Sequence, residues 1–161
     1  MKPQSLFDSA PKRKKPVMLT GRSRKFLEQS GFLVSLVERN LNIPRPGSQE
    51  NFRRKFDAFG IADLIAVKAE VAGTLYIQVT DFSHGAEHKE KILAAKASPV
   101  LLQAQNQVHL HLWKAFRKNG RKLWKLHVYS LCENTNIDEV YFSDCEERWF
   151  YDNRQEYDEG F

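Results

Sequence analysis

Apolar and polar residues alternate along several short segments of the chain, and a period of two is typical of β-strands. The clearest segment is LYIQVT, residues 75–80, where apolar residues take every second position and Tyr76, Gln78 and Thr80 share the opposite side. The segment is apolar enough to be a central strand of a sheet. The sequence therefore predicts a central strand with a line of polar residues on one face.

Two more strands are predicted upstream of this one. FLVSLVE (32–38) is the first, and KFDAFGIADLIAV (55–67) is a longer strand that Gly60 interrupts. Between them, residues 39–55 contain two prolines and a glycine, so we expect a loop there.

Helices are predicted on both sides of these strands. Thr20 is a candidate N-cap for a helix over 21–30, and Gly31 has the place of the residue that ends it. A second helix is expected over 85–97, and Pro99 is well placed to begin a shorter one.

A β-hairpin is predicted in the second half of the chain. VHLHLWKAF (108–116) alternates strictly, and KLWKLHVYSL (122–131) answers it across a short connection. Asn119 and Gly120 in that connection are the strongest short signal for a hairpin turn.

The predicted order of the main elements is helix, strand, strand, strand, helix, strand, strand, and a short helix is expected at 137–142. The helix between the third and fourth strands is long enough for a crossover connection. The predicted fold class is therefore α/β or α+β, with a central mixed sheet flanked by helices.

Length and composition restrict the class of protein. The chain has 161 residues, 42% of them hydrophobic, which indicates one packed domain rather than a disordered chain. No apolar run approaches the ~18 residues of a transmembrane helix, and no signal-peptide pattern opens the sequence, so we expect a cytoplasmic protein with no membrane partner. Cys132 and Cys145 lack metal-type spacing and are expected to be reduced thiols.

Charge divides the chain into three parts. We expect a flexible basic arm at 1–18, a folded domain at 19–131 and an acidic, aromatic extension at 132–161. The extension holds ten acidic and two basic residues, so the rest of the chain is more basic than the net charge of +5 indicates. Such a surface favours a polyanion through counterion release. The alternative is that the charge only keeps the protein soluble.

The basic arm contains a second candidate feature besides its charge. Gln4 to Phe7, QSLF, resembles the short peptides that tether replication and repair proteins to sliding clamps. The alternative is an ordinary disordered terminus.

Two carboxylates lie in apolar surroundings. Asp57 lies in KFDAFG and Asp63 in GIADLIAV. A carboxylate within a strand is costly to bury unless it is hydrogen-bonded, paired or bound to a metal. If the two strands are neighbours, Asp63 lies beside Gln78, and their oxygens are the ligands that Mg²⁺ prefers.

These residues resemble the core of the PD-(D/E)XK nuclease superfamily, in which one strand offers Asp and the next offers (Asp/Glu)-x-Lys. The predicted helix-strand-strand-strand-helix-strand order also matches that core. More narrowly, the segments 57–63 and 78–80 resemble phage and bacterial proteins akin to Holliday-junction resolvases, which carry Asp-Leu-Phe-Gly-x-x-Asp and then Gln-Val-Thr. The resemblance covers roughly residues 20–131 and implies a restriction-endonuclease-like fold.

The resemblance also implies how the site departs from the superfamily pattern. Gln78 replaces the acidic ligand, Thr80 replaces the lysine, and Ala62 stands where a proline is usual. Very-short-patch repair endonucleases also carry a threonine there and use a nearby histidine, for which His84 is the candidate here. His88 is a second candidate, and it shares a helix face with His84 and Lys91 if the helix begins that early.

The resemblance therefore implies a set of catalytic candidates and a set of metal ligands. The catalytic candidates are Asp63, Gln78, Thr80, Lys91 and His84, with Lys91 as a lysine relocated to the following helix. The candidate ligands for Mg²⁺ or Mn²⁺ are Asp63, Gln78, Asp57 and Glu38. Each has a structural alternative: a turn cap for Asp57, a structural carboxylate in an inactive descendant for Asp63, and a surface salt bridge for Glu38. For Gln78 and Thr80 the alternative is sheet hydrogen bonds, for His84 a solvated helix face, and for Lys91 an ordinary surface lysine or a phosphate contact.

Clusters of basic residues are candidates for contact with a phosphate backbone. They are Lys12, Arg13, Lys14 and Lys15 in the arm; Arg53, Arg54 and Lys55 before Asp57; and Arg117, Lys118, Arg121 and Lys122 at the hairpin tip.

The resulting hypothesis is a divergent Mg²⁺-dependent DNA endonuclease that acts on branched or structured DNA. One alternative is a catalytically inactive DNA-binding or assembly module that kept the nuclease fold. Another is a protein-interaction factor acting through its acidic tail. Resolvase-like relatives are often dimers, so a homodimer is a further expectation from the resemblance.

Overall fold

The computed structural model describes residues 18–37, 39–44, 46–47, 51–134 and 139–144. The elements in chain order are α1 (Leu19–Gln29), β1 (Leu33–Leu36), β2 (Arg39–Pro44), β3 (Asn51–Phe56), β4 (Leu64–Val67), β5 (Leu75–Asp81), the 3₁₀ helix η1 (Phe82–His84), α2 (Gly85–Ala94), α3 (Ala97–Gln103), β6 (Gln107–Lys118), β7 (Arg121–Asn134) and β8 (Glu139–Asp144).

Six strands form one mixed sheet in the order β1-β4-β5-β6-β7-β8. All neighbours are antiparallel except β5 and β6, which run parallel and are joined through α2 and α3. The predicted mixed α+β class, with a helix-flanked mixed sheet and a helical crossover before the hairpin, is confirmed. The predicted strand order is wrong in two places, one between β1 and β4 and one after β7.

The first correction concerns residues 39–55, which were expected to form a loop. Instead β2 and β3 pair in antiparallel register over six residue pairs and form a separate two-stranded ribbon. The prolines do not interrupt this ladder, because Pro44 is the last residue of β2 and Pro46 lies in the connection. The turn residues were therefore read correctly, but the strands that flank them were missed.

The second correction concerns the short helix expected at 137–142, where the structure has β8. This strand pairs with β7 over residues 139–144 and extends the sheet. Val140 and Phe142 pack on the hydrophobic core while Tyr141 between them is exposed. The alternation of a strand therefore prevails over the predicted short helix.

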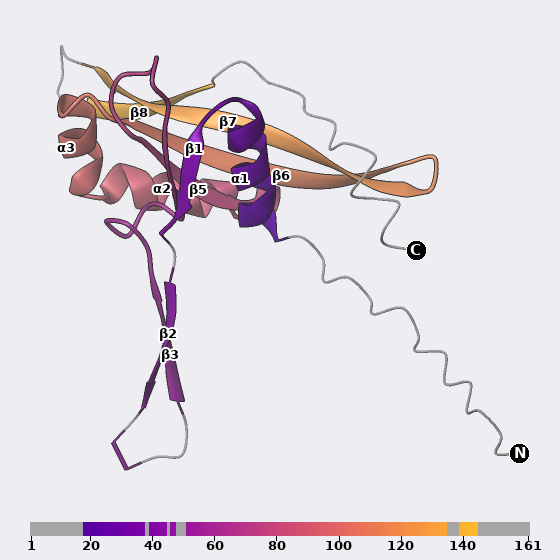
Figure 1. Ribbon diagram of the computed structural model, residues 1–161, viewed down its shortest axis with the longest axis horizontal. Helices are drawn as coiled ribbons and strands as arrows, with labels where there is room; N and C mark the ends of the chain where they lie inside the picture. The colour runs from indigo at the N-terminus through magenta and orange to yellow at the C-terminus, as the bar shows by residue number, and fades with distance from the viewer. Residues whose placement is uncertain (1–17, 38, 45, 48–50, 135–138, 145–161) are drawn as a thin grey trace, which may run out of the picture.

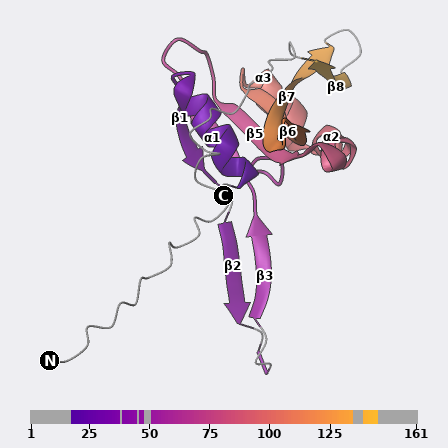
Figure 2. The ribbon, with the colours of Figure 1, turned by 90° about the vertical axis from the view of Figure 1, so that its right-hand side faces the viewer.

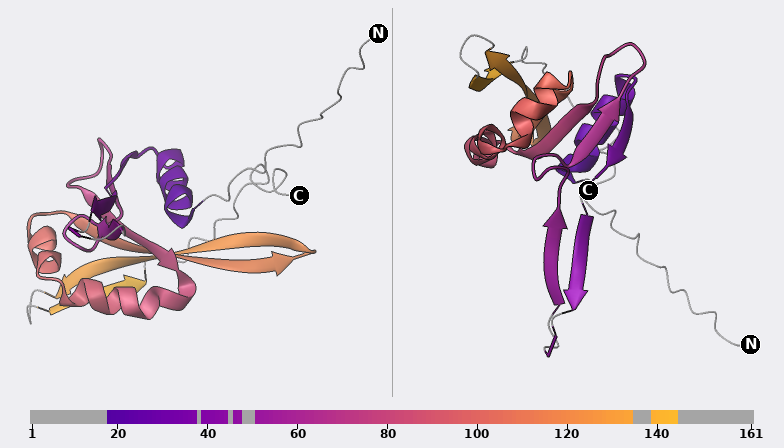
Figure 3. Two further views of the ribbon diagram at one scale, coloured as in Figure 1. Left: turned by 90° about the horizontal axis from the view of Figure 1, so that it is seen from below. Right: turned by 90° about the vertical axis from the view of Figure 1, so that its left-hand side faces the viewer.

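Helix α1 covers one face of the sheet and helices α2 and α3 cover the other (Figures 1 and 3), and a hydrophobic core lies under each layer. On one face Leu27 of α1 packs with Leu64, Ile77 and Leu126 of the strands. On the other face, Ile92 of α2 and Leu101 of α3 pack on alternate residues of β6 and β7. The central strands are covered on both sides, which explains why β5 and β6 are apolar along most of their length.

Helix α1 is fixed to the sheet by a buried polar cluster as well as by apolar contacts. Ser23 is fully buried; its hydroxyl accepts a hydrogen bond from Trp113 Nε1 at 2.8 Å and lies 3.0 Å from Nδ1 of His111. Burial lowers the pKa of His111 to about 3, with the neighbouring His109 acting in the same direction. Near neutral pH His111 is therefore an uncharged hydrogen-bonding group under α1 rather than a cation.

Strands β6 and β7 extend beyond the sheet as a long twisted hairpin (Figures 1 and 3). The predicted turn is confirmed, with Asn119 at φ 52° and Gly120 at φ 77°. Two successive residues with positive φ are what a two-residue type I′ turn requires. The hairpin tip carries the predicted basic cluster away from the body of the protein.

Candidate active site

A tight turn over residues 58–62 lies between the two candidate carboxylates, Asp57 and Asp63. Ala58 and Ala62 form an isolated antiparallel bridge, in which each backbone N–H donates to the other residue's carbonyl oxygen, at 2.9 and 3.1 Å. Phe59 and Gly60 at its tip have φ of 54° and 72°, a conformation that is uncommon for a bulky residue such as phenylalanine. Asp57 and Asp63 flank this bridge on its two strands.

Asp63 is joined to the central strand by its side chain. Its Oδ2 accepts hydrogen bonds from Gln78 Nε2 at 2.6 Å and from the backbone N–H of Val79 at 2.8 Å. Asp63 is 1% exposed and Gln78 is completely buried. The adjacency predicted for Asp63 and Gln78 is thus confirmed, and their contact is a buried hydrogen bond.

Gln78 carries a buried acceptor that the fold does not satisfy. Its Oε1 has no hydrogen-bond partner among the described residues. A buried unpaired carbonyl oxygen costs about 1–3 kcal/mol, so such an atom calls for a ligand, a water or an ion. Carboxylate and amide oxygens are hard donors, and the donor chemistry of Asp63 and Gln78 therefore fits Mg²⁺ or Mn²⁺.

Lys91 reaches the same carboxylate turn from helix α2. Its Nζ lies 3.4 Å from Oδ2 of Asp57, and the two side chains are 44% and 10% exposed. Three segments that are separate in sequence, the turn, β5 and α2, thus place the predicted residues Asp57, Asp63, Gln78 and Lys91 in two contacting pairs. The Ala58–Ala62 bridge lies between Asp57 and Asp63 along the backbone, and we call the four residues together the carboxylate site.

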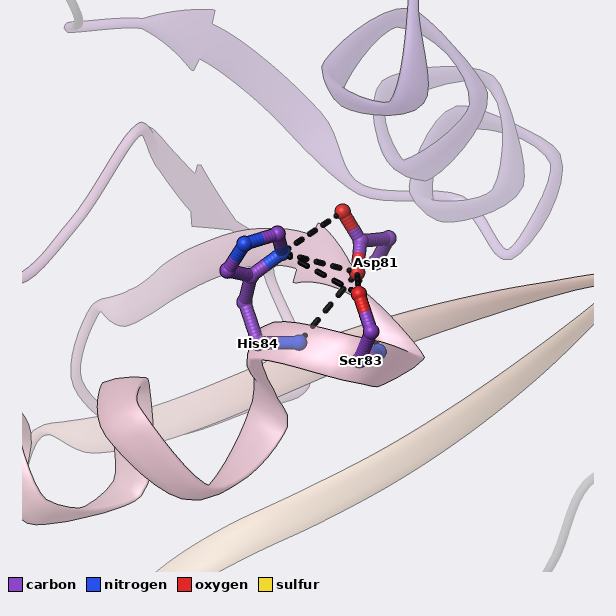
Figure 4. Close-up of polar contacts among 3 residues, drawn as sticks. All are labelled: Asp81, Ser83 and His84. Atoms are coloured by element: carbon purple, nitrogen blue, oxygen red, sulfur yellow. Dashed lines mark hydrogen bonds and ion pairs between the residues drawn. The ribbon is translucent and has the colours of Figure 1, made fainter.

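A third polar cluster lies where β5 ends (Figure 4). Both carboxylate oxygens of Asp81 lie 2.9 Å from Nδ1 of His84, and the Ser83 hydroxyl also hydrogen-bonds to Asp81. Asp81 also caps η1 by accepting from the backbone N–H groups of Ser83 and His84. The Ser83 hydroxyl and then His84 lower the pKa of Asp81 to about 2, against the opposing effect of desolvation.

The ionised Asp81 fixes the tautomer of His84. A carboxylate without a proton can only accept, so Nδ1 of His84 is the donor. Nε2 is then the acceptor whenever the ring is uncharged. The side chains of Asp81 and His84 are 43% and 58% exposed, so the pair, which we call the Asp81–His84 pair, is open to solvent.

The remaining catalytic candidates take simpler positions. Thr80 follows Gln78 on the same face of β5 and is partly buried. His84 lies in η1 and α2 begins at Gly85, so the expected helix face shared by His84, His88 and Lys91 does not begin as early as was required. His88, one turn further, is partly buried.

The candidate DNA contacts are described to different extents. The hairpin-tip residues Arg117, Lys118, Arg121 and Lys122 are exposed. Below them, the Lys122 ammonium lies 4.8 Å and the Arg22 guanidinium 4.9 Å from the centre of the Trp124 ring. Arg53, Arg54 and Lys55 are placed by their backbone in β3.

Several candidates lie outside the described residues. They are Gln4 to Phe7, Lys12, Arg13, Lys14, Lys15, Glu38 and the acidic tail from 145 onwards.

Sequence reasoning missed Asp81 as a functional candidate. The signal was present, because Asp is a preferred N-cap residue and Asp81 directly follows a predicted strand. The buried partnership of Ser23 with His111 had no comparable signal, because those residues lie 88 positions apart.

Comparison of the chain with protein-family models, curated proteins and solved structures finds no match. Within the described ranges, no three His, Cys, Asp or Glu residues gather as a metal site; the amide oxygen of Gln78 is not of these types. None of the helices described is both long and apolar enough to cross a bilayer.

Proposed function

We propose that this protein is a metal-dependent DNA endonuclease and a divergent member of the PD-(D/E)XK superfamily. The observation that carries the proposal is the carboxylate site, where Asp63 contacts Gln78 and Lys91 contacts Asp57. These contacts form although the residues come from three segments that are separate in sequence.

The topology supports the same proposal. Helix α1, the antiparallel strands β1, β4 and β5, the crossover through α2 and the parallel strand β6 follow the helix-strand-strand-strand-helix-strand order of the superfamily core. Asp63 precedes β4 directly and Gln78 lies in β5, which are the two adjacent strands that carry the acidic residues in that core.

Asp63, Gln78 and Asp57 would hold the metal ion. When bound, Mg²⁺ or Mn²⁺ would stabilise negative charge on the phosphate and lower the pKa of a water molecule. Gln78 brings no charge, so we expect weaker metal affinity than a site with a third carboxylate. Glu38 remains a further candidate ligand.

Lys91 and His84 would take over the role of the motif lysine, whose position Thr80 occupies in this chain. The Lys91 ammonium neutralises Asp57 and is exposed enough to contact a phosphate oxygen. Nε2 of His84 is an acceptor for a proton, because Asp81 holds the ring in the required tautomer. Thr80 occupies the vacated lysine position and contributes no cation.

Binding of the DNA backbone would come from the basic clusters. The hairpin tip presents four exposed cations on a projecting arm. Charge neutralisation of this kind makes affinity fall steeply with salt concentration. The resolvase-like resemblance favours branched DNA as a substrate.

The test is a cleavage assay on duplex, single-stranded and four-way-junction DNA with Mg²⁺, Mn²⁺ or EDTA. Asp63→Asn retains an acceptor for Val79 N–H but removes the charge, so it should abolish cleavage in a folded protein. Lys91→Gln should lower the rate at least tenfold, whereas Lys96→Gln, an exposed lysine just after α2, is the charge-matched control and should not. Metal-independent cleavage, or equal rates in Asp63→Asn, would refute the proposal.

A second candidate function is a DNA-binding module that has lost the chemistry. The observation in its favour is that Asp63 and Gln78 are sealed from solvent and hydrogen-bonded to each other, as structural residues are. In this case the same assay shows binding to DNA without cleavage under every metal.

A further inference from the structure

The turn over residues 58–62 holds a phenylalanine in an unfavourable backbone conformation. Phe59 has φ of 54°, in the left-handed region, where Cβ crowds the backbone. Glycine and asparagine are the usual residues in that region, and a bulky side chain there is an outlier. Residues in such conformations cluster at active sites and ligand-binding sites. The turn therefore keeps an aromatic ring where a smaller residue would fit the backbone better.

Burial does not explain why Phe59 occupies this position. The residue is 63% exposed, more than any other phenylalanine, tyrosine or tryptophan that the structure describes. Its ring centre lies 5.7 Å from that of the partly buried Tyr76, with the two planes at 58°. A single tilted contact of this kind supports the ring from one side. The rest of the ring is open to solvent, so the fold gains little from it.

The ring lies beside the carboxylate site. Phe59 follows Asp57 by two residues, which span at most about 7 Å, or two base steps along a DNA strand. The Ala58–Ala62 bridge closes the turn, which begins where the β2–β3 ribbon joins the body of the protein (Figure 2). A phosphate that reaches the carboxylate site would therefore bring its neighbouring nucleotides to this ring.

An exposed aromatic ring in this place is suited to a nucleobase. Stacking on aromatic side chains holds unpaired bases without regard to sequence, because every base has a π-face. Inside a continuous duplex both faces of each base are covered, and a side chain can enter only by unstacking a step. A base face is free where strands separate, at a branch or in a single strand.

We propose that Phe59 stacks on a base exposed beside the phosphate at the carboxylate site, and so selects DNA in which the base stack is interrupted. This inference rests on the proposed function and adds to it the residue that chooses the substrate. It explains why the turn retains an exposed ring in a conformation that disfavours it.

Three substitutions at Phe59 separate stacking from other roles. Phe59→Trp keeps a flat aromatic ring, Phe59→Leu keeps apolar volume without a π-face, and Phe59→Asn removes the ring and tolerates positive φ. Gln105, exposed and with φ of 60°, lies outside the carboxylate site, so Gln105→Asn relieves a similar backbone conformation there. Tyr141→Leu removes another aromatic residue, 48% exposed on β8, and is the control for loss of a surface ring.

The experiment uses a forked DNA, a duplex that opens into two unpaired arms, with 2-aminopurine as the first unpaired base. EDTA is present, so that binding to the full-length chain is measured without cleavage. The wild type should bind the fork roughly tenfold more tightly than a continuous duplex of the same length and should quench the 2-aminopurine fluorescence by stacking. Phe59→Leu and Phe59→Asn should lose the preference and the quenching, whereas Phe59→Trp and both controls should keep them.

Thermal unfolding separates recognition from folding. Phe59→Asn should melt no lower than the wild type, because the ring that it removes is mostly exposed and its backbone conformation suits the new residue. Gln105→Asn should behave in the same way. A clear fall in the melting temperature of Phe59→Asn alone would give the ring a structural role and overturn the inference.

Phe59→Leu that still prefers the fork and quenches the probe would also overturn the inference, as would a wild type that binds fork and duplex equally. Both results leave the cleavage test of Asp63→Asn standing, because that test does not depend on Phe59. Failure of the wild type to bind any DNA would instead reject the proposed function together with this inference.

Discussion

Strand β5 carries two polar pairs that differ in nearly every physical respect, one at its middle residue, Gln78, and one at its last residue, Asp81. The Asp63–Gln78 pair is sealed from solvent in the middle of the sheet, whereas the Asp81–His84 pair lies at the end of the strand with both side chains about half exposed. Of the two pairs, the Asp81–His84 pair is the one open to an incoming water molecule. The comparison teaches that a signature position and an accessible reactive group need not coincide.

Burial also separates the two pairs energetically. Asp63 Oδ2 accepts two hydrogen bonds from donors that have no access to water, so it contributes to stability whether or not it binds a metal. Asp81 accepts its hydrogen bonds at the surface, where water competes for every donor. Removal of the carboxylate should therefore cost more stability at the first pair than at the second.

The largest expected effect is that of Asp63→Ala. This change leaves the buried Val79 N–H and Gln78 amide without their acceptor, which should cost on the order of 3 kcal/mol in the free energy of unfolding. Chemical denaturation at neutral pH measures it. Asp63→Asn is the matched control and should recover most of the loss; a cost below 1 kcal/mol for Asp63→Ala would contradict the buried network.

The next largest effect concerns the buried His111, which should make the free energy of unfolding depend on pH. Burial lowers its pKa from 6.5 to about 3, so between these values the unfolded chain binds a proton that the folded chain does not. Stability should then fall as pH decreases below about 6.5, by about 1.4 kcal/mol per pH unit and about 2 kcal/mol by pH 5. His109, with its pKa lowered to about 4, acts in the same direction.

Denaturation curves at pH 7 and pH 5 measure this slope. His111→Gln should reduce the slope, even though it also lowers stability at pH 7. An unchanged difference between the two pH values in this variant would show that another group is responsible.

A smaller effect is expected from Asp81→Ala. The change removes the cap of η1, which should cost about 1 kcal/mol in the free energy of unfolding. Thermal unfolding of Asp81→Ala beside Asp63→Ala gives the comparison directly. A larger destabilisation in Asp81→Ala than in Asp63→Ala would reverse the roles assigned to the two pairs.

Much of the fold was legible in the sequence, because its signals are local. Asn119-Gly120 specified the hairpin turn, and the apolar residues between Leu75 and Thr80 specified a central strand. The β2–β3 ribbon was missed because Pro44, Pro46 and Gly47 mark a connection without revealing how far pairing extends on either side. Strand β8 was missed because the apolar residues of a six-residue segment can fit the period of a helix or that of a strand. Its pairing with β7 decides between the two.

The candidate site was predictable in part for the same reason. Asp63 and Gln78 lie on consecutive sheet strands, so hairpin logic placed them together. The contact of Lys91 with Asp57 was not predicted, although both residues were candidates, because it depends on the angle at which α2 crosses the sheet. The Asp81–His84 pair depends on where β5 ends, and strand ends are the least certain feature of a sequence pattern.

The most direct test of the proposed metal site is to measure the binding of Mn²⁺ to the protein in the absence of DNA. Electron paramagnetic resonance detects the free ion and so reports the fraction that is bound. The account predicts that the wild type binds Mn²⁺, that Asp63→Asn does not, and that Asp81→Asn binds it as the wild type does. Retained binding in Asp63→Asn, with loss only in Asp81→Asn, would contradict the account by moving the metal to the exposed pair. Absence of binding in the wild type would remove the metal from the mechanism altogether.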